Sequence, residues 1–512
     1  MPSSIGGTRT DETWPVWCKR RSLEDKQSMT RRRALLGFWW GSLSTGFCVA
    51  ASLAAPLAYD SATQPTLPGE PVQSLAIVGA NVVPMDRQGV LQDQTVLIEG
   101  GVIVRVGARD TVEVPSAAHV LDGRGLFVLP GFADMHAHVW PAAELDVLLA
   151  SGVTLAREMF GYRVHLSLRA DVEAGRRAGP RLIVATPIFE GTPPAGHAEV
   201  ILTKDRIIVD DRKTAAQAVA REIARGYDLV KVYNNLNTET YLAIVSASRE
   251  RGVPVVGHVP FDVGLRGVLK AGQQTIEHLR GYVSLAVSPT APDQPGPDYR
   301  SRLVAWRHAD PAVLRRLAEE TARAGTWNVP TLVTMLTLLP SDRIHELTDR
   351  PGWKACMRGS RADPVSNRRR VPYFAVMSDE DFRATQQGVR VQKQLVRMLH
   401  EAGARLLVGT DTSPVGYSFH WELEEMVDAG IPAWDVLRAA TRSAAEYLGK
   451  DESFGTVTPG KRADLVMLRG NPLEDIRRTG AIDALYWRGR LIRAAELEAM
   501  RASACDLLNQ GG

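Results

Sequence analysis

Six residues that commonly bind metal ions end or closely follow short apolar runs at widely separated points of the chain. They are His136, His138, Lys231, His258, His278 and Asp411. His136 and His138 have the i, i+2 spacing that projects both side chains to one face of a strand. Imidazole and carboxylate groups together suit Zn²⁺, with Mn²⁺, Co²⁺ or Fe²⁺ as less favoured ions. The set predicts a metal site if the fold brings these residues together.

Each residue taken alone also has an ordinary structural explanation. A His-x-His pair, or a histidine after an apolar run, is often a core or surface residue. Asp411 suits a helix N-cap, and Lys231 suits a strand end that reaches solvent. The shared context of all six residues favours the metal site.

Residues 131–450 alternate between strand-like and helix-like runs. Leu229–Tyr233 and Leu406–Gly409 are typical of buried strands, and Ala215–Arg225 and Thr238–Arg251 are typical of helices. This alternation predicts a parallel sheet, and about eight such units predict an α/β fold of the (β/α)8 TIM barrel type. Barrel enzymes carry their catalytic groups at the C-terminal ends of strands, where the six residues lie.

The segments that flank the barrel are rich in short β-like runs. Residues 74–130 and 451–496 are predicted to form one small β-sandwich built from both ends of the chain, followed by a C-terminal tail at 497–512. Within the barrel, residues 285–310 and about 340–390 break the alternation and are interpreted as insertions on the loop face.

The N-terminal part predicts export. Residues 1–58 place basic residues, including Arg31-Arg32-Arg33, before an apolar stretch that ends in small residues, which is typical of a signal peptide and loosely resembles a twin-arginine signal. A membrane anchor is the alternative. Residues 59–73 are then a linker, and the mature protein is expected to be periplasmic or secreted, with membrane contact only through the signal.

Charge and cysteine content exclude other classes of protein. The formal net charge is +3, and its basic surplus lies in the N-terminal segment, so no nucleic-acid partner is predicted. Cys18 and Cys48 would leave with the signal, which leaves the pairing of Cys356 with Cys505 open. No catalytic cysteine is implied.

A longer pattern around the six residues resembles the binuclear amidohydrolase superfamily. Its parts are Pro130–His138, Lys231, His258, His278, Gly409–Asp411, Gly455–Val466 and Asn471–Leu473. The similarity spans roughly residues 75–495. Lys231-Val232-Tyr233 and the Gly196-His197 turn are most similar to the imidazolonepropionase-like and Xaa-Pro dipeptidase branch.

The resemblance implies two divalent metal ions, most of all Zn²⁺, bridged by Lys231 after N-carboxylation by CO2. One ion would be held by His136, His138 and Asp411, and the other by His258 and His278. A carbamate is an anionic ligand with two oxygens, whereas an ammonium group cannot bind a cation. A bridging hydroxide would attack the amide of a dipeptide or N-acyl amino acid, and Asp411 would carry the proton to the leaving amine.

Three further residues are candidates for contact with the substrate. Tyr233 should face the same side as the lysine and donate to an oxyanion, unless it is a packing residue. His197 resembles the family's substrate-contacting loop histidine, although a solvated loop residue is the alternative. Arg157 suits a substrate carboxylate, but Glu158 follows it where relatives commonly carry Asp. Glu277 is expected to point away from the site.

Two other functions are weighed against the binuclear hydrolase. One is a mononuclear deaminase or cyclic-amide hydrolase on the same barrel, which would not need Lys231. The other is a non-catalytic binding protein derived from a hydrolase, which the complete set of candidate ligands disfavours. The expected partner is a small amide or peptide substrate, and a homo-oligomer is left open.

Overall fold

The computed structural model describes residues 67–193 and 205–510, which belong to one compact unit. The predicted signal at 1–58, the first part of the linker and His197 therefore lie outside the described residues. In the described part, no helix has both the length and the apolar character needed to cross a bilayer.

The centre of the chain contains two parallel sheets. The first has the order β7-β8-β9, with β7 (Phe132–Ala137), β8 (Val153–Glu158) and β9 (Arg181–Val184). The second has the order β11-β10-β12-β13-β14-β15. Its strands are β10 (Phe189–Glu190), β11 (Ile207–Ile208), β12 (Val230–Val232), β13 (Val255–Gly257), β14 (Thr275–Glu277) and β15 (Trp327–Val329). These short strands are buried along their length, apart from β11 and the first residue of β9, as expected for strands covered on both faces.

Backbone hydrogen bonds continue from one parallel sheet to the other at both edges. Three of them run from Thr186 N to Leu229 O (2.8 Å), from Leu407 N to Asn328 O (3.0 Å) and from Met135 N to Val408 O (2.8 Å). The segment 406–408 therefore lies between β15 and β7. Through it, the extended segment that leads to Asp411 is placed beside β7, which carries His136.

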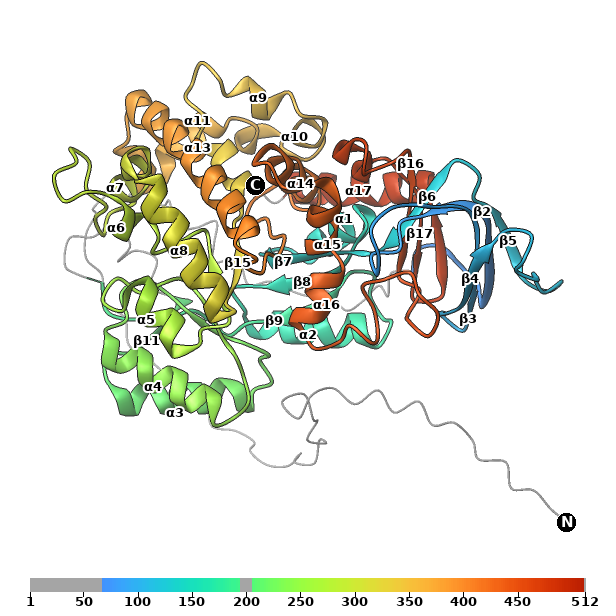
Figure 1. Ribbon diagram of the computed structural model, residues 1–512, viewed down its shortest axis with the longest axis horizontal. Helices are drawn as coiled ribbons and strands as arrows, with labels where there is room; N and C mark the ends of the chain where they lie inside the picture. Colours follow the sequence, from blue (N-terminus) through green and yellow to red (C-terminus); the bar gives the residue numbers. More distant parts are fainter. Residues whose placement is uncertain (1–66, 194–204, 511–512) are drawn as a thin grey trace, which may run out of the picture. The chain divides into compact units, whose positions relative to one another are not determined.

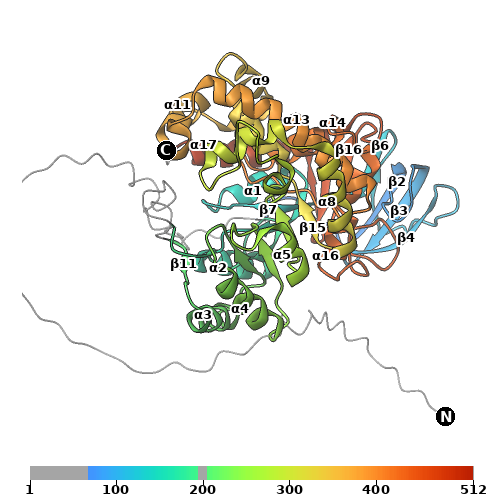
Figure 2. The same ribbon diagram turned by 60° about the vertical axis from the view of Figure 1, so that its left-hand side comes forward.

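Helices alternate with the parallel strands (Figure 1). They are α1 (Glu144–Ala150), α2 (Arg163–Glu173), α3 (Arg212–Ala224), α4 (Thr238–Arg249), α5 (Gly264–Ala271), α8 (Pro311–Ala324), α13 (Asp379–Glu401), α14 (Tyr417–Asp428), α15 (Ala433–Ala439) and α16 (Arg442–Tyr447). In α8, the Asp310 side chain caps the first turn and Gly325 ends the helix in a left-handed conformation. The buried face of α8 follows helical spacing from Leu314 to Thr321. Helices α8 and α13 lie side by side (Figure 2).

Both β-rich ends of the chain join one nine-stranded sheet, seen in blue and red in Figure 1. The junction is the antiparallel pair of β6 (Leu126–Pro130) and β16 (Leu465–Arg469). The other strands are β1 (Glu70–Pro71), β2 (Ser74–Val82), β3 (Leu91–Glu99), β4 (Val102–Ala108), β5 (His119–Asp122), β17 (Ile482–Trp487) and β18 (Arg490–Arg493). The two ends thus pair with each other, as the sequence predicted.

The segments interpreted as insertions contain short helices. They are α6 (Val283–Ala286), α7 (Tyr299–Val304), α9 (His345–Thr348), α10 (Pro351–Cys356), α11 (Pro364–Arg370) and α12 (Pro372–Ala375). The stretch predicted as a C-terminal tail instead lies largely in α17 (Ala494–Gln510). Cys356 and Cys505 form a disulfide that joins α10 to α17, which settles the pairing that the sequence left open.

Candidate metal centre

His136 and His138 lie at the C-terminal end of β7 and share one side of it. Their ring centroids are 5.3 Å apart, and His136 is 1% exposed. Gly409 lies against this strand, and a Cβ there would be 2.5 Å from Val329 Cγ1 and 2.8 Å from His136 N. Only a glycine allows the two backbones to approach this closely.

Asp411 faces three of the histidines. Its Oδ1 lies 2.8 Å from His138 Nε2 and 3.7 Å from His136 Nε2, and its Oδ2 lies 3.5 Å from His278 Nε2. The backbone aims these groups in an unusual way, because Asp411 has a φ of 51° and His278 a φ of 57°. The Asp411 N–H also donates to His136 O at 2.7 Å.

His258 and Lys231 complete the cluster from β13 and β12. The ring centroids of His258 and His278 are 5.0 Å apart, and Tyr233 stacks on His258 at 4.0 Å. Lys231 is 2% exposed, and burial lowers its pKa to about 8. The positive charge of Lys231 contributes to the lowered pKa values of His136, His258 and His278.

Each of the four imidazoles has a polar partner at Nδ1. The pairs are His136 with Glu277 Oε2 (2.7 Å), His138 with Glu158 Oε1 (3.3 Å), His258 with Asn234 Oδ1 (2.8 Å) and His278 with Thr331 Oγ1 (2.7 Å). With Nδ1 as the donor to an oxygen in each pair, Nε2 is the ring nitrogen available to a cation. The expectation that Glu277 points away from the site is wrong, since it holds His136.

The electrostatics of the cluster favour the neutral form of three of its imidazoles, those of His136, His258 and His278. Burial lowers the pKa of His136 to about 4 and those of His258 and His278 well below 6.5. Burial also opposes the charged form of His138, but hydrogen bonds to Asp411 and Glu158 raise its pKa to about 10. The pKa of Asp411 falls well below its usual range, because the facing imidazoles outweigh burial. A carboxylate faced by imidazoles is a cation-binding arrangement.

Arg157 lies beneath this cluster and does not face an open space. It is fully buried, and its guanidinium donates to Glu277 Oε1 at 2.9 Å and to the Tyr447 hydroxyl at 3.0 Å. Its Nε donates to Met135 O at 2.5 Å. This arrangement gives Arg157 the role of holding Glu277, which differs from the predicted contact with a substrate carboxylate.

Tyr233 lies at the edge of the cluster, half-buried between the His258 ring and the guanidinium of Arg206, whose Cζ is 4.3 Å from the Tyr233 ring centroid. Of the predicted ligands, His136, His278 and Asp411 have ligand atoms within 4.8 Å of one another. This donor set of imidazole nitrogens and a carboxylate oxygen fits a divalent cation.

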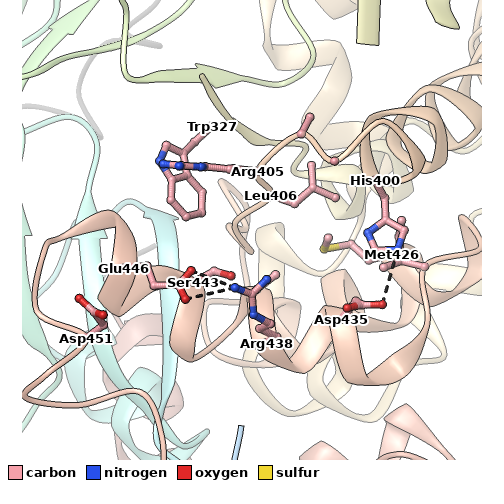
Figure 3. Close-up of a pocket in the computed structure, with 14 residues that line it drawn as sticks. Trp327, His400, Arg405, Leu406, Met426, Asp435, Arg438, Ser443, Glu446 and Asp451 are labelled. Atoms are coloured by element: carbon pink, nitrogen blue, oxygen red, sulfur yellow. Dashed lines mark hydrogen bonds and ion pairs between the residues drawn. The ribbon is translucent and has the colours of Figure 1, made fainter. Parts of the chain in front are cut away.

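A separate cavity of about 680 Å³ lies away from these residues (Figure 3). It is lined by Trp327, which begins β15, whereas the histidine cluster lies beyond the other end of the parallel strands. Arg438 pairs with Glu446 at 3.1 Å and His400 with Asp435 at 3.5 Å along its wall. None of the predicted site residues lines it.

Parallel strands with histidines clustered at their carboxyl ends place the chain among α/β proteins with a candidate metal centre. The family model described as the amidohydrolase family matches residues 127–492, and the chain belongs to this family. The match confirms the resemblance to this superfamily, and the similar solved structures imply a TIM-barrel-type α/β fold.

The chain is similar to several characterised proteins. It is 24% identical to the imidazolonepropionase of Streptomyces griseus over 404 residues, 74% of this chain and 86% of that protein. The structure of a bottromycin amidohydrolase has a TM-score of 0.66 and 25% identity, over 90% of this chain and 95% of that one. A Xaa-Pro dipeptidase structure with bound methionine has a TM-score of 0.61 and 20% identity, over 82% of this chain and 100% of that one. The chain spans about a third of the length of the adenine deaminases of Chelativorans and Bradyrhizobium that it matches.

Proposed function

We propose that the chain is an exported, binuclear metal-dependent amidohydrolase that cleaves the amide bond of a dipeptide or N-acyl amino acid. One observation carries the proposal: each of four clustered imidazoles, two of them fully buried, has a polar partner at Nδ1, so that Nε2 is the ring nitrogen available to a cation. Such outer partners orient histidine ligands and fix their tautomers. The names of the similar dipeptidase and amidohydrolase structures support the substrate class.

The proposal includes the finer architecture of the fold. The hydrogen bonds that link the two parallel sheets at both edges support a closed (β/α)8 barrel. A shared apolar core supports a small β-sandwich beside it, because Leu75 and Val128 from the first β-rich segment pack with Leu465 and Tyr486 from the second. Both features would hold the strand ends that carry the histidines.

Two ions are proposed to lie within the cluster. His136, His138 and Asp411 would hold one, His258 and His278 the other, and carboxylated Lys231 would lie between them. The buried position of Lys231 and its pKa of about 8 support carboxylation, because a neutral amine is the form that reacts with CO2. When bound, divalent ions lower the pKa of water toward about 7 and polarise a carbonyl oxygen.

The protein's own residues would then orient the substrate and move the proton. Asp411 takes the proton from the attacking water and returns it to the leaving amine, because its carboxylate lies among three imidazoles and remains ionised at neutral pH. Tyr233, stacked on His258, is placed to donate to the developing oxyanion. His197 stays a prediction, since it lies outside the described residues.

The test is metal analysis of the purified mature protein together with a screen of dipeptides and N-acyl amino acids. We expect about two zinc ions per chain and amide hydrolysis, both lost in Lys231→Ala and retained in the matched control Lys213→Ala, an exposed lysine on α3. A Lys231→Ala protein with one ion and full activity would favour the mononuclear alternative. A protein that binds no metal would favour the binding protein.

Export is proposed on separate grounds. The disulfide between Cys356 and Cys505 supports it, because structural disulfides persist in oxidising compartments and are rare in the cytosol. Cell fractionation of the full chain should place the protein in the periplasm or medium. Its retention in the cytosol with both cysteines reduced would contradict the proposal.

A further inference from the structure

Three aromatic side chains form a cluster beside His138, which we call the aromatic wall: Trp140, Phe160 and Tyr162. Trp140 stacks on the His138 ring with 5.9 Å between centroids and an interplanar angle of 27°. Phe160 lies 5.9 Å from Trp140 and 6.5 Å from His138, and Tyr162 lies 5.0 Å from Phe160. The wall therefore begins directly at a candidate metal ligand.

The wall is fixed in place by the chain around it. The backbone N–H of Trp140 donates to Glu144 Oε2 at 2.8 Å, and the backbone N–H of Tyr162 donates to His165 Nδ1 at 3.0 Å. His165 is fully buried, and its Nε2 donates to Val139 O at 2.7 Å, which ties the segment after β8 to the segment after β7. The aromatic wall is a built surface at the strand ends that carry the cluster.

Trp140 nevertheless remains 39% exposed. A large aromatic ring that stays partly exposed next to a candidate metal ligand offers an apolar surface to a group bound at the site. The carboxylates under the wall are already engaged. Glu158 accepts from the Val139 N–H (2.6 Å) and the Phe160 N–H (2.8 Å), and Glu144 is 2% exposed. The wall thus offers ring faces and edges, and the two neighbouring carboxylates are held by backbone N–H groups.

We infer that the aromatic wall binds an aromatic or large aliphatic group that flanks the scissile amide, so that the substrate class is amides with such a group. This inference rests on the proposed function. The argument is one of reach, since an amide held at Asp411, 2.8 Å from His138 Nε2, has its neighbouring substituent beside the ring on which Trp140 stacks. Aromatic rings pair at centroid distances of about 4.5–7 Å, the spacing already present within the wall.

The experiment compares matched substrates on the zinc-loaded full chain and its variants. The panel pairs N-acetyl-phenylalanine with N-acetyl-alanine, and dipeptides with Phe or Ala on either side of the amide. We expect the wild type to prefer the Phe members, and Trp140→Ala to lose on the order of ten-fold or more in kcat/KM on them through KM. Trp140→Phe should recover most of that loss. The readout is the ratio of kcat/KM on the Phe member to kcat/KM on the Ala member of each pair, which should fall in Trp140→Ala and return in Trp140→Phe.

Leu242→Ala is the control, because Leu242 is a 49% exposed apolar residue on α4. This substitution should leave kcat/KM unchanged on both the Phe and the Ala substrates. Zinc content of each variant is measured so that a displaced His138 is recognised. If the wild type cleaves amides without preference for Phe, or if Trp140→Ala slows both members of a pair equally, the inference is overturned while the proposed function stands. If the wild type cleaves no amide, both are overturned.

Discussion

Replacement of Glu277 by Gln tests whether this carboxylate orients His136 for metal binding. Glu277 is fully buried and joins two groups: His136 Nδ1 donates to it at 2.7 Å and Arg157 Nη2 at 2.9 Å. Burial alone would raise the pKa of Glu277, but Arg157 and His136 hold it well below its usual range. Glu277→Gln keeps the shape of the side chain and removes the charge that both partners use.

Two effects of different size follow. Loss of an outer partner of a histidine ligand weakens metal binding by about 10–100-fold, which is about 1.4–2.7 kcal/mol. Arg157 is fully buried, so the loss of its counterion costs about 3–5 kcal/mol of stability. Because the pKa of Glu277 is depressed in the folded state, its contribution is present above the unfolded value of 4.5 and is lost as pH falls below it.

The assay is zinc titration against a competing chelator, with denaturant unfolding of the metal-free protein at pH 7.5 and pH 4. Glu222→Gln is the matched control, because Glu222 on α3 is equally buried but pairs with Arg225, the residue that follows this helix. The control should retain zinc affinity. Wild-type zinc affinity in Glu277→Gln would refute the claim that this carboxylate orients His136, and an unchanged unfolding free energy would refute the coupling to Arg157.

Three further changes have outcomes set by the structure. Gly409→Ala should lower zinc affinity and activity at least ten-fold and reduce the free energy of unfolding by about 1–3 kcal/mol, because the new Cβ would lie 2.8 Å from His136 N. Zinc titration and denaturant unfolding of the variant measure these two effects. The double variant Cys356→Ser, Cys505→Ser should lower the free energy of unfolding by up to about 5 kcal/mol, since the disulfide closes a loop with a sequence separation of 149. Reduction of the disulfide in the wild type should lower the free energy of unfolding by the same amount. His420→Gln should flatten the pH dependence of unfolding: burial lowers the pKa of His420 to about 3, so stability is complete above 6.5 and lost as pH falls. At pH 5 the wild type should have lost about 2 kcal/mol that the variant keeps, and parallel pH profiles would contradict this.

The sequence predicted the candidate ligands better than the residues that hold them. His136, His138 and His278 lie at the ends of strands, and Asp411 follows the extended segment 406–408. Because strand ends meet in a parallel fold, the sequence pattern alone predicts that these residues lie together. Glu277 was misplaced for a specific reason. Period-two alternation puts Glu277 and His278 on opposite faces, but His278 has a φ of 57°, so its side chain turns back toward the same centre. A left-handed residue of this kind has no signature in a sequence.

Arg157 shows a second limit of the sequence pattern. A buried strand residue of a barrel either faces the open end, where substrate binds, or contacts the layers of side chains below it. The sequence around β8 is compatible with both, and the structure places Arg157 in the lower layer, with Met135 O and Tyr447 as partners. Which layer a residue occupies depends on the stagger between strands, which only the assembled sheet defines.

Backbone strain also gathers at the candidate metal centre. Among the described non-glycine residues with positive φ, His278 (57°), Leu279 (52°), Thr331 (50°) and Asp411 (51°) belong to it or adjoin it. Each such residue costs about 1–3 kcal/mol and persists only where its neighbours over-determine it. The neighbours are present here, because the His278 N–H donates to Val329 O at 2.9 Å and the Asp411 N–H to His136 O at 2.7 Å. Glycine at position 278 or 411 would relieve the backbone strain but would also remove the imidazole or carboxylate that faces the cluster. The fold therefore retains strain at the two positions where the site needs these side chains.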